Sequence, residues 1–385
     1  MSNKWVIKGL VAACALSAQG VLHAATPVSD SVSVIGDMRT GFYALDRNDR
    51  DASAVNKNEW RLRLRVGLES KVTESLKARL RLAGRYTTHE SSADPEFELY
   101  SGITPGKDGL AMGQTTVDEA WLNYTRGGLS VRLGRMQTKF ELTGVAKKSL
   151  DRNNSPNTDI AWTDGLYLKH KGSNGWTAHA IAQLNPAGGS GELRRKPLDF
   201  SDDDSRISYF FAYDKSEKKA TIVQQGIDLT YLPAALPTDN GGRDDYLALV
   251  GRMAAQWPMG SEGMKFLLGG ELGYAPNTPS NSALQLDAAG DSGGSAGQVT
   301  FNFIDIVPRH SLGIVLARAD AGWLLSPDFT SNQYLYETRY RWNLAKGQRI
   351  EVRLRYRTDI EQSSSSANPQ KREDKDLYAR YTLKF

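Results

Sequence analysis

The sequence has little of three features that would each assign it to a common class of protein. It contains one cysteine in 385 residues, its formal net charge is only +4, and 40% of its residues are hydrophobic. Its sustained apolar stretch, Trp5–Leu22, is interrupted by polar residues and Gly20. A helix that spans a bilayer needs about 20 mostly apolar residues, so the sequence excludes a helical membrane protein. Its many Tyr, Trp, Leu and Val residues exclude a wholly disordered chain.

The amino terminus has the layout of a secretory signal peptide. Lys4 and Lys8 supply a short basic region, Gly9–Ala18 supplies an apolar one, and Ala24 precedes the expected cleavage site. We therefore expect residues 1–24 to be removed during export. A buried N-terminal helix is the alternative, and Val11–Cys14 is a weaker match to a lipoprotein motif.

Cleavage after Ala24 removes Cys14 and two lysines. The mature chain then contains no cysteine, which excludes disulfide bonds, a thiolate nucleophile and a cysteine metal site. Loss of Lys4 and Lys8 lowers the formal net charge from +4 to +2. A balance so close to zero argues against nucleic-acid binding, so we expect no nucleic-acid partner.

The rest of the sequence alternates apolar and polar residues in short segments. In Glu59–Glu69, five apolar residues alternate with arginines. Side chains in a strand point alternately to opposite faces, so this segment is predicted to be a strand with one apolar and one charged face. The same pattern predicts sixteen strands: 33–45, 59–70, 75–86, 116–125, 129–138, 164–172, 175–184, 206–213, 220–232, 245–257, 264–275, 298–307, 310–319, 333–342, 349–358 and 376–385.

The connections between the predicted strands alternate in length. Those leaving even-numbered strands are short, as in 71–74 and 126–128, whereas those leaving odd-numbered strands are mostly long, as in 87–115 and 276–297. This segregation is typical of a transmembrane β-barrel with short periplasmic turns and long extracellular loops. The sequence therefore predicts an all-β fold, a transmembrane antiparallel β-barrel of about 16 strands in one domain, residues 25–385. A soluble sandwich is the alternative, because alternation alone does not show which face meets water.

Several segments resemble those of the Gram-negative outer-membrane porins. The last segment, Asp376–Phe385, alternates apolar positions and ends in an aromatic residue, and Asp118–Leu122 and Asp164–Tyr167 are also porin-like. The resemblance covers Thr26–Phe385. It implies a location in the cell outer membrane, contact with outer-membrane lipid and lipopolysaccharide, a homotrimer, and recognition of the terminal phenylalanine by the barrel-insertion machinery.

The polar faces of the predicted strands are unusually rich in arginine. A barrel of sixteen strands encloses a water-filled channel, and these faces would line it. On six strands they carry fifteen basic residues against three acidic ones, Glu69, Glu337 and Glu351; Glu59 and Asp376 open their strands and are expected outside the wall. The basic residues are Arg61, Arg63, Arg65, Lys77, Arg79, Arg81, Arg85, Arg132, Arg339, Arg341, Arg353, Arg355, Arg357, Arg380 and Lys384.

A closed barrel brings its last strand beside its first, so these residues are expected to form one largely continuous wall. Charged walls act on permeating ions through their local field, and this one predicts a preference for anions. The alternative is that the arginines pair with acidic residues and hold the wall rigid. Both can be true at once.

The third connection that leaves an odd-numbered strand, 139–163, is the candidate constriction loop. In the porins that the chain resembles, the loop at this position folds into the barrel and narrows it. Acidic side chains of such a loop, here Glu141, Asp151 and Asp159, would face the arginine wall and set a field across the channel. The loop departs from a purely acidic one, because it also carries Lys139, Lys147, Lys148 and Arg152.

No motif of a catalytic or cofactor site stands out, so we expect a protein that is not an enzyme and has no cofactor. The remaining histidines show no catalytic spacing, and Asp202–Asp204 is interpreted as a solvated loop rather than a metal site. The sequence predicts passive diffusion of small hydrophilic solutes, with a preference for anions. The main alternative is a channel specific for phosphate or other anionic nutrients, since guanidinium groups suit oxyanions. A structural or adhesive barrel is a third possibility.

Overall fold

The computed structural model describes nine segments of the chain: residues 26–87, 111–112, 116–151, 163–185, 206–237, 243–260, 263–326, 328–362 and 369–385. All regular structure in these segments is β-strand. None of the described residues belongs to a helix long and apolar enough to cross a membrane. The predicted signal peptide, residues 1–24, lies outside the described residues, as does Asp159.

Eighteen strands form a single sheet, and sixteen of them are long. The other two, β1 (Thr26–Pro27) and β5 (Ala111–Met112), have two residues each. The long strands are β2 (Val32–Asn48), β3 (Ala54–Lys71), β4 (Leu76–Thr87), β6 (Thr116–Arg126), β7 (Leu129–Met136), β8 (Thr163–Lys171), β9 (Thr177–Asn185), β10 (Arg206–Ser216), β11 (Ile222–Pro237), β12 (Arg243–Pro258), β13 (Lys265–Tyr274), β14 (Ser295–Val307), β15 (His310–Ala319), β16 (Gln333–Ala345), β17 (Gln348–Asp359) and β18 (Glu373–Lys384).

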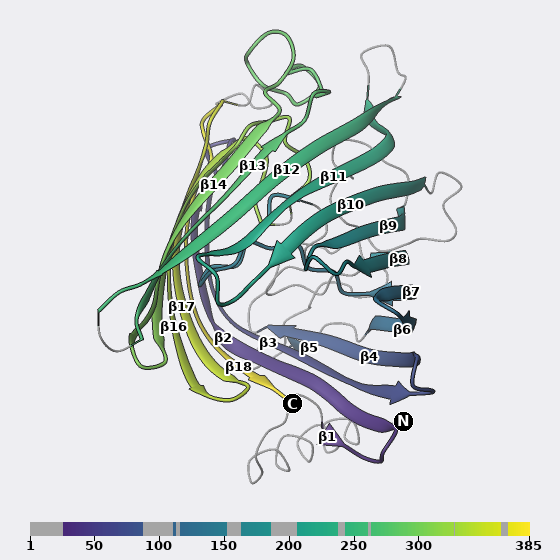
Figure 1. Ribbon diagram of the computed structural model, residues 1–385. Helices are drawn as coiled ribbons and strands as arrows, with labels where there is room; N and C mark the ends of the chain where they lie inside the picture. Colours follow the sequence, from purple (N-terminus) through teal and green to yellow (C-terminus); the bar gives the residue numbers. More distant parts are fainter. Residues whose placement is uncertain are drawn as a thin grey trace, which may run out of the picture.

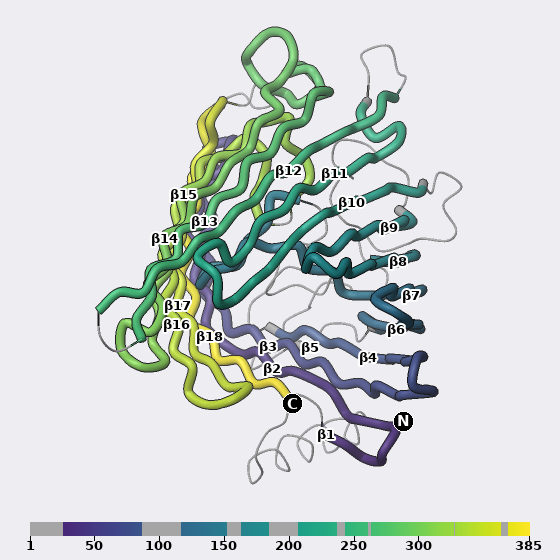
Figure 2. The backbone as a smooth tube through the Cα atoms, in the orientation of Figure 1, coloured from purple at the N-terminus to yellow at the C-terminus, as the bar shows by residue number. Residues whose placement is uncertain are grey.

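Each long strand pairs antiparallel with its neighbours, and the sheet closes on itself (Figure 1). The closing pair is β18 with β2, in which Lys384 lies opposite Asp37. Beyond it, the Phe385 amide donates to the Gly36 carbonyl at 3.1 Å, and the Gly36 amide donates back at 2.8 Å. The tube in Figure 2 follows the same path, with the first and last long strands side by side. The predicted sixteen-stranded antiparallel barrel is confirmed, and each predicted strand overlaps an observed one.

The two faces of the sheet differ in chemistry, as the alternation predicts. On β3, Leu68 is 51% exposed on the outer face, whereas Arg63 is 4% exposed on the inner face. Large apolar side chains such as Leu80, Leu122 and Leu133 are likewise exposed on the outer face of neighbouring strands. An outward apolar band with a polar interior is the arrangement of barrels that lie in lipid.

Short turns close one end of the barrel and long connections leave the other. At the first end, residues 127–128 and 346–347 link neighbouring strands, and Gly128 adopts the positive φ of 86° that a tight turn favours. At the other end, the connections cover residues 137–162, 275–294, 320–332 and 360–372. Two connections at this end are short, residues 49–53 between β2 and β3 and residues 238–242 between β11 and β12.

Candidate functional site

The predicted basic residues lie on the inner faces of β3, β4, β7, β16, β17 and β18. Several are direct cross-strand neighbours: Arg63 lies opposite Arg39 of β2 on one side and Arg85 of β4 on the other, and Arg339 lies opposite Arg353. Like charges directly opposite each other destabilise a sheet unless opposite charges lie between them. We call the inward-facing arginines and lysines of these strands and of β2 the basic wall.

The basic wall contains more acidic residues than the sequence predicts. Glu59 and Asp376, expected outside it, are buried on its inner face, because β3 begins at Ala54 and β18 at Glu373. Six carboxylates beyond the predicted three form ion pairs with the predicted basic residues, so the prediction of only three acidic partners is wrong. The additional residues are Asp37, Glu59, Asp118, Glu119, Asp374 and Asp376.

Two of these acids, Asp118 and Glu119, are adjacent in sequence and both point inward. In the pairing of β4 with β6, Arg81 lies opposite Glu119 and Leu82 lies opposite Val117, so Asp118 is an extra residue in the ladder. Such a bulge interrupts the alternation of side chains and can turn two successive residues to the same face. Strict alternation, on which the sequence prediction depends, places only one of the two inside.

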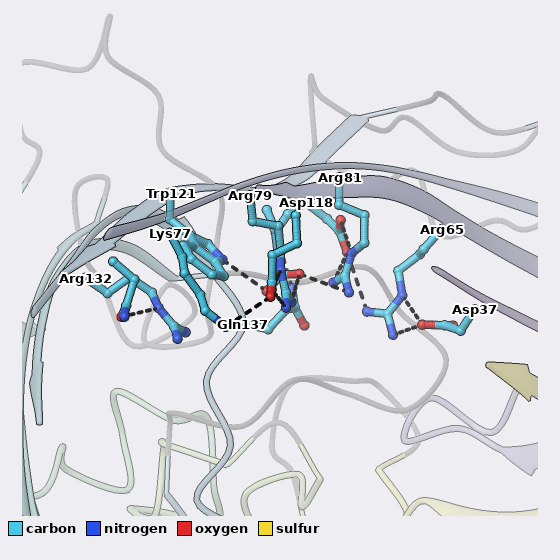
Figure 3. A network of polar contacts seen from close by, with 12 residues as sticks. Asp37, Arg65, Lys77, Arg79, Arg81, Asp118, Trp121, Arg132 and Gln137 are labelled. Carbon is cyan, nitrogen blue, oxygen red and sulfur yellow. Dashed lines mark hydrogen bonds and ion pairs between the residues drawn. The ribbon is translucent and has the colours of Figure 1, made fainter. Parts of the chain in front are cut away.

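The bulge brings its carboxylates into the middle of an arginine row (Figure 3). Arg81 donates to Asp118 through Nε and Nη2, both at 2.9 Å. Arg79 donates to Glu119 at 3.0 Å, and Arg65 lies 3.5 Å from Asp118. Arginine matches a carboxylate with two parallel hydrogen bonds, which orients both groups. The row is therefore a rigid, largely neutralised network.

A second network surrounds Glu351 on β17. Its carboxylate accepts hydrogen bonds from Arg380 at 2.6 Å, from Arg339 at 3.2 Å and from the Tyr378 hydroxyl at 2.6 Å. Arg341 and Arg349 lie within 3.6 Å and 3.3 Å of the same group. Four guanidinium groups therefore share one carboxylate, and this part of the wall keeps an excess of positive charge.

The described part of the candidate constriction loop before β8, residues 139–151, lies inside the barrel; we call it the inward loop. Its backbone amides donate to side chains of the inner wall on three strands. Thr143 donates to Gln224 Oε1 at 2.6 Å, Val145 to Asn302 Oδ1 at 2.7 Å and Leu150 to Glu271 Oε2 at 3.0 Å. These partners belong to β11, β14 and β13, so the loop covers the side of the barrel away from β2–β4.

The acidic residues of the inward loop do not face the basic wall as expected. Asp151 is fully buried and forms an ion pair with Arg252 of β12 at 2.7 Å. Arg252 also pairs with Asp228 and Glu271, so Asp151 belongs to a buried cluster on the far side of the barrel. Glu141 pairs with Lys147 of its own loop at 3.1 Å.

The exposed charged side chains of the inward loop are instead basic. Lys139 and Lys147 are exposed to the interior, whereas Lys148 is buried against the wall. Partial burial lowers the pKa of Lys139; the Glu141 carboxylate opposes this shift, and the charges of Arg39 and Arg65 on the basic wall add to it. The loop thus presents positive charge toward a wall that is itself basic.

A second connection also enters the barrel, and the sequence did not predict it. Residues 320–332, between β15 and β16, carry Trp323, Leu325 and Phe329, all buried with Ala146 and Leu150 of the inward loop. The strands that enclose this cluster have small apolar residues on their inner faces, such as Ala248, Ala296 and Ala317. We call this group the apolar inner cluster. Apolar residues on both faces of β12 are the sequence signal that something covers its inner face.

The described residues contain no group of three or more His, Cys, Asp or Glu side chains that could hold a metal ion. The three carboxylates around Arg252 are already occupied by its guanidinium group, on which all of them converge. His179 is one of the histidines that the sequence gives no catalytic role. Its Nδ1 shares a hydrogen bond of 2.7 Å with the Tyr167 hydroxyl, and its Nε2 lies 3.4 Å from Asp214.

Comparison with solved structures identifies the architecture. Pseudomonas putida OprB superposes with a TM-score of 0.56 at 12% identity, covering 92% of this chain and 94% of that one. The chain has the porin fold. Acinetobacter baumannii OccAB3 gives a TM-score of 0.52 at 10% identity, with coverage of 91% and 99%. A mutant of Rhodopseudomonas blastica porin gives 0.51 at 12% identity, with coverage of 92% and 100%.

Comparison of the sequence alone identifies no family. No protein-family model matches it, and no curated protein does. Structural similarity at 10–12% identity establishes the fold alone. Which solutes pass has to be inferred from the residues of the interior.

Proposed function

We propose that this protein is an outer-membrane porin, a water-filled channel through which small hydrophilic solutes diffuse and in which anions are favoured. A barrel of sixteen strands is wide enough to hold an aqueous channel, unlike one of eight. Its apolar exterior suits lipid, and its charged interior suits water and ions.

The observation that supports the anion preference is the positive charge on both sides of the interior, on the inward loop and on the basic wall. Lys139 lies within electrostatic reach of Arg39 and Arg65, so the inward loop and the basic wall present positive charge to each other. Ion pairs neutralise much of the wall, but the arginines around Glu351 outnumber its single carboxylate. A passage with excess positive charge on both sides raises the local concentration of anions.

Single-channel recording in a planar bilayer tests this function. The purified protein is expected to conduct in symmetrical KCl, and in a KCl gradient its reversal potential should have the sign of a chloride-preferring channel. A cation-preferring reversal potential overturns the anion preference. A folded barrel that never conducts overturns the channel itself and favours a structural or adhesive role.

A second candidate is a channel selective for phosphate or other anionic nutrients. Arg39, Arg63 and Arg85 occupy directly adjacent positions on three strands, and guanidinium groups bind oxyanions with paired hydrogen bonds. Chloride conductance that saturates, and that low concentrations of inorganic phosphate block, favours this candidate over a general pore. Linear conductance without block favours the general pore.

The same proposal includes export, membrane contacts and assembly. Residues 1–24 are proposed to be cleaved as a signal peptide, which mass spectrometry of the mature protein tests through a chain beginning at Ala25. The proposed homotrimer is tested by cross-linking in outer-membrane vesicles that contain lipid and lipopolysaccharide. Recognition of Phe385 by the barrel-insertion machinery predicts that Phe385→Ala lowers the amount of assembled barrel in the outer membrane.

A further inference from the structure

The inward loop is held from two sides, by the barrel wall and by residues 320–332. Trp323 Nε1 donates to the Leu150 carbonyl at 3.1 Å, and Ser326 Oγ donates to the Ser149 carbonyl at 2.5 Å. In return, the Ser149 amide donates to Asp328 Oδ2 at 3.1 Å. Three successive contacts thus satisfy backbone groups of the inward loop with side chains of the second connection. A buried backbone group left without such a partner costs free energy.

The position of Trp323 is itself set by the wall. Its side chain is 1% exposed and packs against Gly273 of β13, where an added Cβ would lie 2.5 Å from the indole ring. The Tyr246 hydroxyl donates to the Gly322 carbonyl at 3.0 Å and accepts from the Leu324 amide at 3.1 Å. Contacts with Gly273 of β13 and with Tyr246 of β12 therefore fix the position of residues 322–324.

Lys148 adds a charged anchor beside these contacts. Its ammonium group lies 3.0 Å from Glu337 Oε2 on β16 and 5.6 Å from the centre of the Phe329 ring. Its side chain is almost fully buried, so it turns away from the water into which Lys139 and Lys147 project. Residues 143–151 are thus attached to β11–β16 and to residues 320–332, while the part that carries Lys139 and Lys147 remains exposed.

We propose that residues 320–332 are a positioning element for the constriction, and that Trp323 and Ser326 determine the selectivity of the channel by holding the inward loop against β11–β16. With the loop held there, Lys139 and Lys147 stay on the ion path and the space beside the β2–β4 part of the basic wall remains open. Release of the loop removes the two lysines from their fixed place and lets the loop enter that space. This inference rests on the proposed channel function.

Bilayer recordings of Trp323→Ala and Trp323→Phe test the role of the indole. We expect Trp323→Ala to lower the chloride-to-potassium permeability ratio by roughly twofold, since the field at a constriction depends on where its charges lie. We also expect frequent brief closures as the loop moves. Trp323→Phe keeps most of the packing, and its permeability ratio should lie between those of wild type and Trp323→Ala. Trp257→Ala on the outer face of β12 is the matched control, because that indole is exposed away from the interior.

Ser326→Ala provides a variant that leaves the packing intact. It removes the hydroxyl that donates to Ser149 and that accepts from the amides of Asp328 and Phe329. We expect the same direction of change as in Trp323→Ala, with recovery in Ser326→Thr, which keeps a hydroxyl. Unheated gel mobility shows whether each variant forms a barrel.

A coupling experiment separates positioning from general destabilisation. Lys139→Gln is expected to lower the permeability ratio in the wild-type background and to change it much less in Trp323→Ala, because the lysine no longer has a fixed place. Equal effects in the two backgrounds overturn the inference, as does a conducting Trp323→Ala channel with unchanged selectivity and no added closures. A wild-type protein that does not conduct overturns the proposed function instead, so the two failures are distinguishable.

Discussion

Arg81 of β4 and Asp118 of β6 form a two-point ion pair, with Nε and Nη2 each 2.9 Å from a carboxylate oxygen. Asp118 is fully buried, and it reaches this position because the bulge in β6 turns it inward beside Glu119. The pair shows how the barrel tolerates so many arginines on one face. In this row the counter-charge is a carboxylate that strict alternation would have placed outside.

Replacement of Asp118 by asparagine is expected to lower stability and to strengthen the anion preference together. A buried guanidinium group that loses its partner costs about 3 kcal/mol, although Glu119, 3.0 Å from Arg81, retains part of the interaction. Denaturant unfolding in detergent measures the loss, and the reversal potential in a KCl gradient measures the selectivity. Asp46→Asn, on the exposed outer side of β2, should change neither. An anion preference that falls in Asp118→Asn would contradict the role of the wall.

The alternation of residues predicts the barrel well because lipid and water select opposite faces of each strand. Its failures lie where another interaction replaces that selection. β3 begins five residues before the predicted Glu59, since Asn56 and Asn58 continue the ladder with β2 although they break the apolar pattern. The prediction fails at the Asp118 bulge for a related reason, because register shifts depend on the partner strand and are not visible in the alternation.

The apolar inner cluster escaped prediction because it joins residues far apart in the sequence. Trp323 and Leu150 contact each other across the interior, and each lies in a connection whose own sequence has no period. The apolar residues on the inner face of β12, such as Ala248 and Val250, predict a strand, and the alternation alone does not say which connection covers them. The basic wall was predictable in position but not in net charge, since three of its additional counter-charges come from β2 and β6 and three from β3 and β18.

Lys139 and Lys147 are expected to contribute to selectivity more than any buried arginine, because they are exposed to the interior. The double substitution by glutamine should shift the reversal potential in a KCl gradient toward that of a less selective channel by roughly 10 mV, with the largest shift at low salt, where screening is weakest. Lys375→Gln, exposed on the outer face of β18, is the matched control and should leave it unchanged. A shift of equal size in the control would place the selectivity elsewhere.

Lys148 gives the stability a pH dependence of defined sign. Burial lowers its pKa from the ordinary 10.5 to about 8; Glu337 and Asp328 oppose this shift, and Arg355 and Arg339 add to it. Between these values the unfolded chain binds more protons than the folded one, so the free energy of unfolding rises with pH from about 8 to 10.5. The contribution is fully present above pH 10.5 and is lost as the pH falls through about 8.

The variant Lys148→Met isolates that contribution. The difference in free energy of unfolding between wild type and Lys148→Met should grow in favour of wild type by about 3 kcal/mol across this window, at 1.4 kcal/mol for each unit of pKa. Urea titrations of both proteins in the same detergent, at intervals from pH 7 to pH 10.5, measure it. A difference that is constant with pH would show that Lys148 keeps its ordinary pKa in the folded barrel.

Gly273 offers an independent way to move Trp323 without changing either inward connection. A methyl group at this position would lie 2.5 Å from the indole ring, so Gly273→Ala must displace the ring or the strand. Overpacking of this kind costs about 1–3 kcal/mol. If Trp323 positions the inward loop, Gly273→Ala should lower the chloride-to-potassium permeability ratio in the same direction as Trp323→Ala. Gly251→Ala is the matched control, since an added Cβ there meets no atom within 4 Å. A destabilised Gly273→Ala barrel with the selectivity of wild type would separate the packing of the indole from the passage of ions.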